Sequence, residues 1–241
     1  GTSKMLGSIE EMHYYFNEQL KAADNSTYQQ FLVPQIDFLF NVAQDVYVKM
    51  IAFPLYNPIP KFELTSRVRN NIYTLVVNAA VKDTNVTKYD DTSYLYKLPT
   101  DCQYFLGGSV VANNGDCYKE LELFSVTHEH STTKDYTIKS SFLWEECNYL
   151  MIEGGIKLEV IDFNVEGVKP NYVRYSKYMH YAEKHSTNGY KKITGETLTG
   201  KQNSELPKNA LVDVVNIAVL LTKMDLGMDV NAQLSKIRDI N

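Results

Sequence analysis

The fold is decided by the stretch from Tyr94 to Thr127, which reads YLYKLPTDCQYFLGGSVVANNGDCYKELELFSVT. Two apolar runs in it, Phe105 to Ala112 and Tyr118 to Thr127, flank the turn-forming residues Asn113-Asn114-Gly115-Asp116. An Asn-Gly pair suits a type I′ turn, because both central residues need positive φ, which Gly adopts freely and Asn tolerates. The stretch therefore predicts a β-hairpin that turns at this Asn-Gly pair.

The alternation of apolar and polar residues continues beyond the hairpin. It recurs in residues 136–142, in residues 149–152 and 156–161 on either side of Glu153-Gly154-Gly155, and in the tyrosine-rich run from Tyr172 to Tyr181. Such patterns place one face of a strand on a core and the other in water, and tight turns between them favour antiparallel pairing. With the short run Tyr190 to Ile193 as a last strand, residues 94–193 are predicted to form a largely antiparallel β-rich part.

Helical periodicity precedes the β-rich part. Ser8 to Glu11 match a capping box at the start of a helix that ends near Ala23. A second helix carries the longest apolar stripe of the chain, from Pro34 to about Met50. A third helix is predicted from about Leu64 to Val81, and the polar residues 82–93 are predicted to form a loop. Residues 1–93 are therefore predicted to be an N-terminal helical part.

The chain becomes helical again towards its C-terminal end. After the polar segment Glu183 to Asn203, a helix is predicted from Leu206-Pro207 to about Met224, and Asp229 can cap a final helix that reaches Ile240. Residues 194–241 are therefore predicted to complete the helical part. The fold class is a single α+β domain, with a helical bundle formed from both chain ends and a largely antiparallel β-sheet region in the middle. Five residues are predicted to be core: Leu39, Phe40, Val68, Leu75 and Val215.

The composition narrows the classes of function. The chain has 241 residues, of which 44% are hydrophobic, and this is enough for a folded core. Its net charge of -5 argues against a general binder of the nucleic-acid backbone, since such proteins carry basic patches. The sequence lacks a run of about 18 apolar residues and a leader with a basic and an apolar part, so neither a membrane span nor secretion is predicted.

The three cysteines, Cys102, Cys117 and Cys147, are odd in number and lack C-x-x-C spacing. They are predicted to be free thiols of a protein that is assembled in a reducing cytoplasm.

Catalytic and metal-binding patterns are weak in this sequence. His128-Glu129-His130 places two imidazoles on one face of a strand, and Cys117 or Cys147 could complete the zinc site of a metal-dependent hydrolase. The spacing matches no common zinc signature, however. The chain is therefore predicted not to be an enzyme. No catalytic, cofactor-binding or metal-binding residues are assigned, and no cofactor is predicted. The metal-dependent hydrolase is kept as an alternative.

Tyrosine is unusually abundant, with 18 residues against a single tryptophan. Its apolar body and polar tip suit surfaces that become buried on assembly. A second alternative is therefore a carbohydrate-binding module that uses exposed tyrosines as a platform on one sheet face.

Several short motifs occur in an order that resembles a known family. They are the helical segment Asp37-Phe38-Leu39-Phe40-Asn41-Val42-Ala43, Arg67 on the next predicted helix, Leu98-Pro99-x-Asp101-x-x-Tyr104, Tyr172-Val173-Arg174-Tyr175, and Glu205-Leu206-Pro207 followed by Val215-x-x-Ala218-Val219. Together they resemble the ring or adaptor proteins of the virion neck in tailed bacteriophages, those of the crAss-like phages in particular. The resemblance covers about residues 28–224. The polar segment Glu183 to Asn203 is long for the family, and the predicted helices at 8–23 and 229–240 lie outside the shared part.

The resemblance implies a structural role. Gatekeeper-type head-to-tail connectors of this family combine a helical bundle with a β-rich part and form a ring, expected to be twelvefold, on the portal around the DNA channel. The implied partners are further copies of the chain, the portal protein and the adjacent neck or tail ring proteins. Contact with genomic DNA in the channel is implied to be transient and non-specific, and no membrane is implied. The implied location is the neck or tail of the virion, after assembly in the cytoplasm of the bacterial host.

Two surfaces follow as expectations from this role. The terminal helices and the segment Glu183 to Asn203 are predicted to make the contacts between subunits, because they are amphipathic or polar and lie at the periphery. Asp90-Asp91 either faces the channel lumen or belongs to an ordinary solvated loop.

Overall fold

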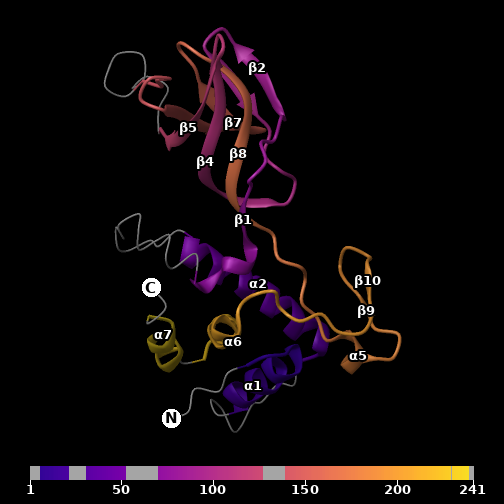
Figure 1. The fold of residues 1–241 in the computed structure, drawn as a ribbon. Coiled ribbons are helices and arrows are strands. Elements are labelled where there is room, and N and C mark those ends of the chain that lie inside the picture. The colour runs from indigo at the N-terminus through magenta and orange to yellow at the C-terminus, as the bar shows by residue number, and fades with distance from the viewer. Residues whose placement is uncertain (1–5, 22–30, 53–69, 127–138, 229, 239–241) are drawn as a thin grey trace. The chain divides into compact units, whose positions relative to one another are not determined.

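The computed structural model describes residues 6–21, 31–52, 70–126, 139–228 and 230–238 (Figure 1). The chain divides into two compact units. Residues 1–75 and 176–241 form one, called the helical unit here, and residues 76–175 form the other, called the β unit. The fold is α+β with a large, mostly antiparallel sheet, as the sequence predicts. None of the described helices is long and apolar enough to cross a bilayer.

The β unit consists of one eight-stranded sheet. Its strands are β1 (Val76–Asn78), β2 (Val86–Asp90), β3 (Ser93–Tyr96), β4 (Cys102–Asn114), β5 (Cys117–Ser125), β6 (Glu146–Ile152), β7 (Gly155–Glu159) and β8 (Asn164–Arg174). They are arranged in the order β1-β8-β4-β5-β6-β7-β3-β2. All neighbours pair antiparallel except β5 and β6, which are parallel. The apolar faces of the strands enclose a common core that includes Tyr96, Val110, Leu121, Cys147, Ile156, Leu158 and Val168.

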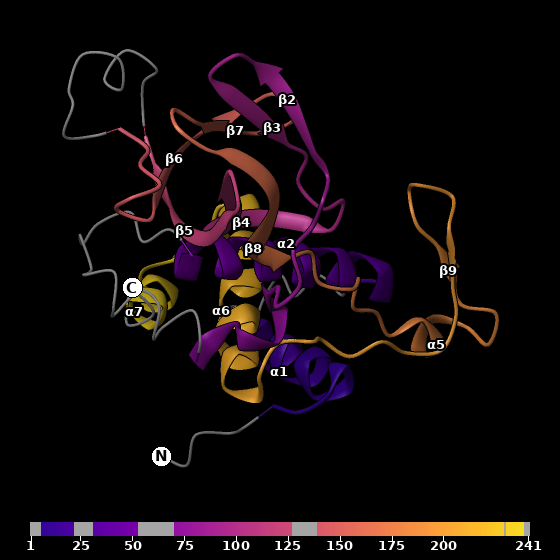
Figure 2. The ribbon, with the colours of Figure 1, turned by 45° about the horizontal axis from the view of Figure 1, so that its top comes forward.

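The sheet curls until the chain before β2 meets β8 (Figure 2). There Asp83 and Val168 exchange two backbone hydrogen bonds, with N···O distances of 2.7 and 2.9 Å. Gly167 allows this approach, since a Cβ built on it would lie 2.7 Å from the Asp83 carbonyl oxygen. The Tyr96 hydroxyl also donates to Asp83 Oδ2 at 3.0 Å. We call this contact between residues 82–83 and 166–168 the seam of the β unit.

The hairpin predicted at residues 113–116 is confirmed, but its turn lies one residue further along. Asn114 pairs with Cys117, so Gly115 and Asp116 are the central residues of the turn. Among the described residues, Glu145 is the only one other than glycine with positive φ, and Gly115 has φ 64°. The predicted type I′ turn centred on Asn114-Gly115 is therefore wrong, because it requires positive φ at both central positions.

The helix predicted from Leu64 to Val81 is wrong over its second half. Helical backbone ends at Asn71, a 3-10 turn covers Tyr73–Leu75, and β1 follows. The loop predicted at 82–93 contains β2, which pairs with β3. Both strands are short: β1 has only three residues, and β2 consists mostly of exposed residues, so neither shows a clear alternation.

The last predicted strand of the block is displaced. β8 begins at Asn164 and ends at Arg174, whereas Tyr175 to Met179 lie outside any strand. The β unit covers residues 76–175. The sequence predicts a β-rich part at residues 94–193, so both of its boundaries lie 18 residues too late. Of the run predicted at 136–142, only residues 139–142 are described, and they form a bend with a single bridge at Ser141.

The helical unit is built from both ends of the chain. Its elements are α1 (Ile9–Lys21), α2 (Val33–Ala52), the 3-10 turn η1 (Tyr73–Leu75), α5 (Ala182–His185), β9 (Tyr190–Lys191), β10 (Thr197–Leu198), α6 (Lys208–Asp225) and α7 (Asn231–Arg238). α1 and α2 both pack on α6, and α7 packs on α6 as well. The strand predicted at Tyr190 is confirmed as β9, but it pairs with β10 in a small hairpin of the helical unit and does not belong to the large sheet.

The core of the helical unit agrees with most of the predicted residues. Phe40, Leu75 and Val215 are fully buried. Leu39 is only partly buried, because it faces a groove described below, and its assignment to the core is wrong. Val68 lies outside the described residues. The apolar face of α1, with Ile9, Met12 and Phe16, is buried within the chain itself.

Candidate functional site

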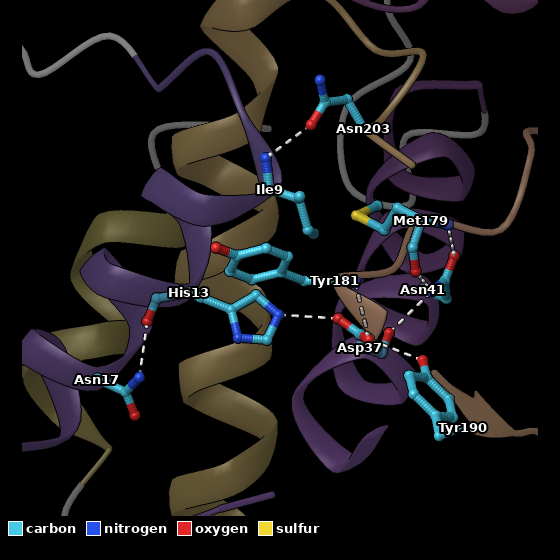
Figure 3. A network of polar contacts seen from close by, with 9 residues as sticks. All are labelled: Ile9, His13, Asn17, Asp37, Asn41, Met179, Tyr181, Tyr190 and Asn203. Atoms are coloured by element: carbon cyan, nitrogen blue, oxygen red, sulfur yellow. Dashed lines mark hydrogen bonds and ion pairs between the residues drawn. The ribbon is translucent and has the colours of Figure 1, made fainter. Parts of the chain in front are cut away.

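A buried carboxylate, Asp37, joins three separate parts of the helical unit (Figure 3). His13 Nε2 on α1 lies 2.8 Å from Asp37 Oδ1. The Tyr190 hydroxyl on β9 and the Tyr181 backbone N–H both donate to Asp37 Oδ2, at 2.7 and 3.0 Å. A carboxylate only accepts hydrogen bonds, so His13 carries its hydrogen on Nε2 in this arrangement. Asp37 thereby fixes α1 and the segment 181–190 against α2.

Asn41, one turn after Asp37, extends this connection. Its Nδ2 donates to the Met179 carbonyl oxygen at 2.8 Å, and its Oδ1 accepts from the Met179 N–H at 3.0 Å. The side-chain amide thus pairs with the backbone as a neighbouring strand would. Nδ2 also lies 2.8 Å from the carbonyl oxygen of Asp37. The segment that enters the helical unit after Tyr175 is therefore held to α2 at two successive turns.

The pairing of His13 with Asp37 has the composition of a catalytic dyad but lacks the surroundings of one. Both side chains are fully buried, and the His13 ring makes edge contacts with Phe40 and Tyr181 at centroid distances of 5.3 and 5.6 Å. Its Nδ1 has no hydrogen-bond partner among the described residues. A dyad activates a nucleophile that substrate can reach. The arrangement is therefore a structural anchor.

An apolar groove of about 670 Å³ lies beside this anchor. Tyr190 belongs to both: its hydroxyl binds Asp37, and its side chain lines the groove. Phe38 and Ile193 are 54% and 99% exposed. The lining residues come from the start of α2, the β9–β10 hairpin and the end of α6: Phe31, Pro34, Gln35, Phe38, Leu39, Tyr178, Tyr190, Lys191, Lys192, Ile193, Thr194, Thr222, Asp225 and Leu226.

The aromatic wall of the groove is held uncharged. Burial, and next the hydrogen bond to Asp37, raise the pKa of Tyr190, and burial raises the pKa of Tyr178. Lys192 covers the Tyr178 ring, with Nζ 4.2 Å from the centroid, and pairs with Glu196 at 2.6 Å. Exposed Lys191 adds a second cation at the groove, and Asp225 is the acid that lines it. The groove can thus accept apolar side chains next to a polar rim.

The residues of the hydrolase alternative are only partly described. His128, Glu129 and His130 lie outside the described residues. Cys117 is exposed at the start of β5, whereas Cys147 lies in the core of the β unit, where burial raises the pKa of its thiol to about 12. Cys147 is thus a core residue with little thiolate to bind a metal. Within the described ranges, no three His, Cys, Asp or Glu side chains converge on a common point for a metal ion.

The exposed tyrosines of the described ranges do not gather on one sheet face. Tyr89 lies on β2, Tyr118 on β5 and Tyr175 directly after β8, and these three strands are not neighbours in the sheet order. Tyr14 and Tyr73 belong to the helical unit. The exposed tyrosines among the described residues are thus spread over both units, and the carbohydrate-binding platform stays a prediction.

Asp90 is the last residue of β2 and pairs with Ser93, and Asp91 and Thr92 form the turn to β3. Asp90 Oδ1 accepts from the Thr92 N–H at 2.8 Å and the Thr92 hydroxyl at 3.0 Å. Hydrogen bonds from Ser93 first, and then from Thr92, lower the pKa of Asp90 to about 2. The pair thus closes an exposed hairpin, and a position facing a channel stays a prediction.

A scan against models of protein families finds no match, and a search of curated proteins finds no significantly similar chain. The site therefore stands on its own geometry. The sequence placed Asp37 in a helical segment without giving it a role. An acidic residue within an otherwise apolar stripe is the one local signal of a buried polar contact, because buried carboxylates require donors.

Proposed function

We propose that the chain is a structural subunit of the virion neck of a tailed bacteriophage, a gatekeeper-type connector that assembles into a ring between the portal and the tail. In this proposal it lines the DNA channel and acts on no substrate. Its partners are copies of itself, the portal protein and adjacent neck or tail ring proteins. The helices from both chain ends then act as one bundle that carries the contacts to neighbours.

One observation carries the proposal beyond the sequence resemblance: the exposed apolar groove of the helical unit. Contiguous apolar surface of this kind marks sites that another macromolecule covers, since leaving it in water costs free energy. It is bordered by Lys191 and Lys192, and most of its described lining residues are aromatic or aliphatic. The groove therefore favours assembly over chemistry.

The groove also refines which segments are proposed to contact neighbours. The segment Glu183 to Asn203 contributes Tyr190, Lys191, Lys192, Ile193 and Thr194 to the groove, which supports its role at an interface. The apolar face of α1 packs on α6 in its own chain, and this removes the reason for expecting a contact there. A net charge of -5 is compatible with a lumen that lets DNA pass without binding it tightly.

The test is the mass of the native particle, measured by light scattering and negative-stain imaging, with and without the portal protein of the same phage. We expect closed rings, either from the chain alone or on the portal. A stable monomer that does not bind the portal would contradict the proposal. Metal analysis of the same sample checks the hydrolase alternative, because stoichiometric zinc with hydrolytic activity would replace a structural role by a catalytic one.

A further inference from the structure

A second apolar feature projects from the β unit, in the loop before β6. Leu143 and Trp144 are 73% and 75% exposed, and Trp144 is the only tryptophan of the chain. Large apolar side chains this exposed, side by side, are costly in water, and tryptophan is the residue most often found at the centre of protein interfaces. We call these two residues the knob.

The knob sits on a loop whose conformation is fixed. Ser141 and Glu146 exchange two backbone hydrogen bonds, at 2.8 and 3.1 Å, and the Trp144 N–H donates to Ser141 Oγ at 3.3 Å. Glu145 has a φ of 61°, a left-handed conformation that non-glycine residues rarely hold without support from their surroundings. That support includes Lys119, whose Nζ lies 3.2 Å from Glu145 Oε1 and 3.4 Å from the Phe142 carbonyl oxygen. Little entropy would be lost when such a loop binds.

We propose that the knob of one copy inserts into the apolar groove of the next copy. This inference rests on the proposed ring and names the contact that builds it. The groove has about 670 Å³ of space and walls of aromatic and aliphatic side chains, which fit a tryptophan and a leucine in chemical character. A buried aromatic side chain covers about 150–250 Å², so the knob is the anchor of a larger interface of about 800 Å² per partner.

The charges around the two features are complementary. Glu146 is exposed directly after the knob, and Lys191 is exposed at the groove. The neighbouring Glu145 and Lys192 already form ion pairs within their own chain, with Lys119 and Glu196. Asp225 is the one acid among the described residues that line the groove. The opposite charges favour one orientation of the knob and disfavour contact between two knobs or between two grooves.

The contact is heterologous, because knob and groove are different surfaces of the same chain. After the first contact, the pair of copies therefore still offers one free knob and one free groove. Such an interface generates a ring when the rotation between successive copies closes, and a filament when it does not. A symmetric dimer, in contrast, would use the same surface on both copies and stop at two.

A complementation experiment tests the proposal. Trp144→Ser removes the knob and leaves the groove, and Phe38→Glu blocks the groove and leaves the knob. We expect each variant alone to associate about thirtyfold or more weakly than wild type, as for the loss of a central tryptophan. Mixed one to one, they should form a dimer that does not grow, because one knob and one groove remain. Tyr118→Ser and Val46→Glu are the matched controls, on exposed positions of the same two units, and should assemble like wild type.

Tryptophan fluorescence provides the second readout. In the Phe38→Glu variant alone, Trp144 should keep the red-shifted emission of an exposed indole at all concentrations. Adding the Trp144→Ser variant should shift that emission to the blue, since the only tryptophan then enters a groove. If the chain assembles only on the portal, the variants and the mixture are compared there.

The outcomes separate the two proposals. Rings from wild type and from both single variants, or a mixture without dimers, would overturn the knob-and-groove contact and leave the ring intact. A wild-type chain that stays monomeric with the portal present would overturn both.

Discussion

At the scale of single residues, the helical unit depends on a buried charge that is fully surrounded by donors. Asp37 accepts from residues 24, 144 and 153 positions away in the sequence. Burying a carboxylate is costly, and hydrogen bonds to it offset that cost only while every donor is in place. The same contacts hold Tyr190 in the wall of the groove, so the stability of the helical unit and the shape of the groove are linked through one side chain.

Asp37→Asn should therefore destabilise the protein by about 3 kcal/mol, because the amide accepts through only one of its two terminal atoms, whereas the carboxylate accepts through both. Tyr190→Phe removes one bond to the carboxylate and should cost about 2 kcal/mol. Urea denaturation at neutral pH measures both. Asp45→Asn, on the exposed face of the same helix, should cost less than about 1 kcal/mol, because polar contacts at an exposed position contribute little to stability. Equal stability of Asp37→Asn and wild type would show that the carboxylate does not hold these segments.

A second carboxylate gives the protein a pH dependence of opposite sign from the usual acid denaturation. Burial raises the pKa of Asp213, on α6, to about 6 from an unfolded value of 3.8. Between these two values the folded state holds a proton that the unfolded state has lost, so this group's contribution to stability falls as the pH rises. Asp213→Asn should be about 2 kcal/mol more stable than wild type at pH 7 and equal to it below pH 4. Urea denaturation of wild type and Asp213→Asn at pH 7 and below pH 4 measures this difference in stability. If the stability of both proteins changes equally between the two pH values, Asp213 is not the cause.

At the scale of elements, the seam decides whether the sheet of the β unit curls on itself. The backbone of Asp83 reaches Val168 only because Gly167 has no side chain. Around this contact, Lys82 pairs with Glu166 at 3.2 Å and Asn113 Nδ2 donates to Glu166 Oε1 at 2.5 Å. The sequence predicts a loop at residues 82–93, but the backbone pairing of Asp83 with Val168 closes the sheet there.

Gly167→Ala should open the seam and destabilise the β unit by about 2 kcal/mol, because the added methyl group would overlap a backbone oxygen. The rate at which a thiol reagent labels Cys147 in increasing urea measures the unfolding of the β unit, because Cys147 is fully buried in its core. Gly7→Ala meets only ordinary contacts, at 3.5 Å, and is the control for a glycine substitution elsewhere. Unchanged protection of Cys147 in Gly167→Ala would mean that the seam adds nothing to stability.

At the scale of the whole molecule, each unit has its own buried core. The core cluster around Leu121 and Cys147 draws all of its residues from 76–175, and both ends of that range lie on or next to paired strands. A fragment of residues 76–175 should therefore fold alone and unfold in one cooperative transition. Circular dichroism and protection of Cys147 from labelling measure this. A fragment that is labelled at once in native buffer would show that the β unit needs the rest of the chain.

The sequence by itself determined the α+β class, the course of α1, α2 and α6, the hairpin at Gly115 and the turn at Gly154. These features rest on local information: the repeat of apolar residues every two or 3.6 positions, and the turn residues between the runs. The same information assigned Phe40 and Val215 to the core but also Leu39. Periodicity identifies the apolar face of a helix and does not reveal whether that face meets the core or a groove.

Only the tertiary structure decided the seam, the donors around Asp37, the groove and the exposure of Trp144. β1 and β2 are strands because β8 and β3 pair with them, and their own residues carry little alternation. Asp37 is buried because its donors come from α1 and from residues 181 and 190. The physical reason is that these features are stabilised by contacts between residues far apart in the chain. A sequence pattern records only which nearby residues lie on the same face of a helix or strand.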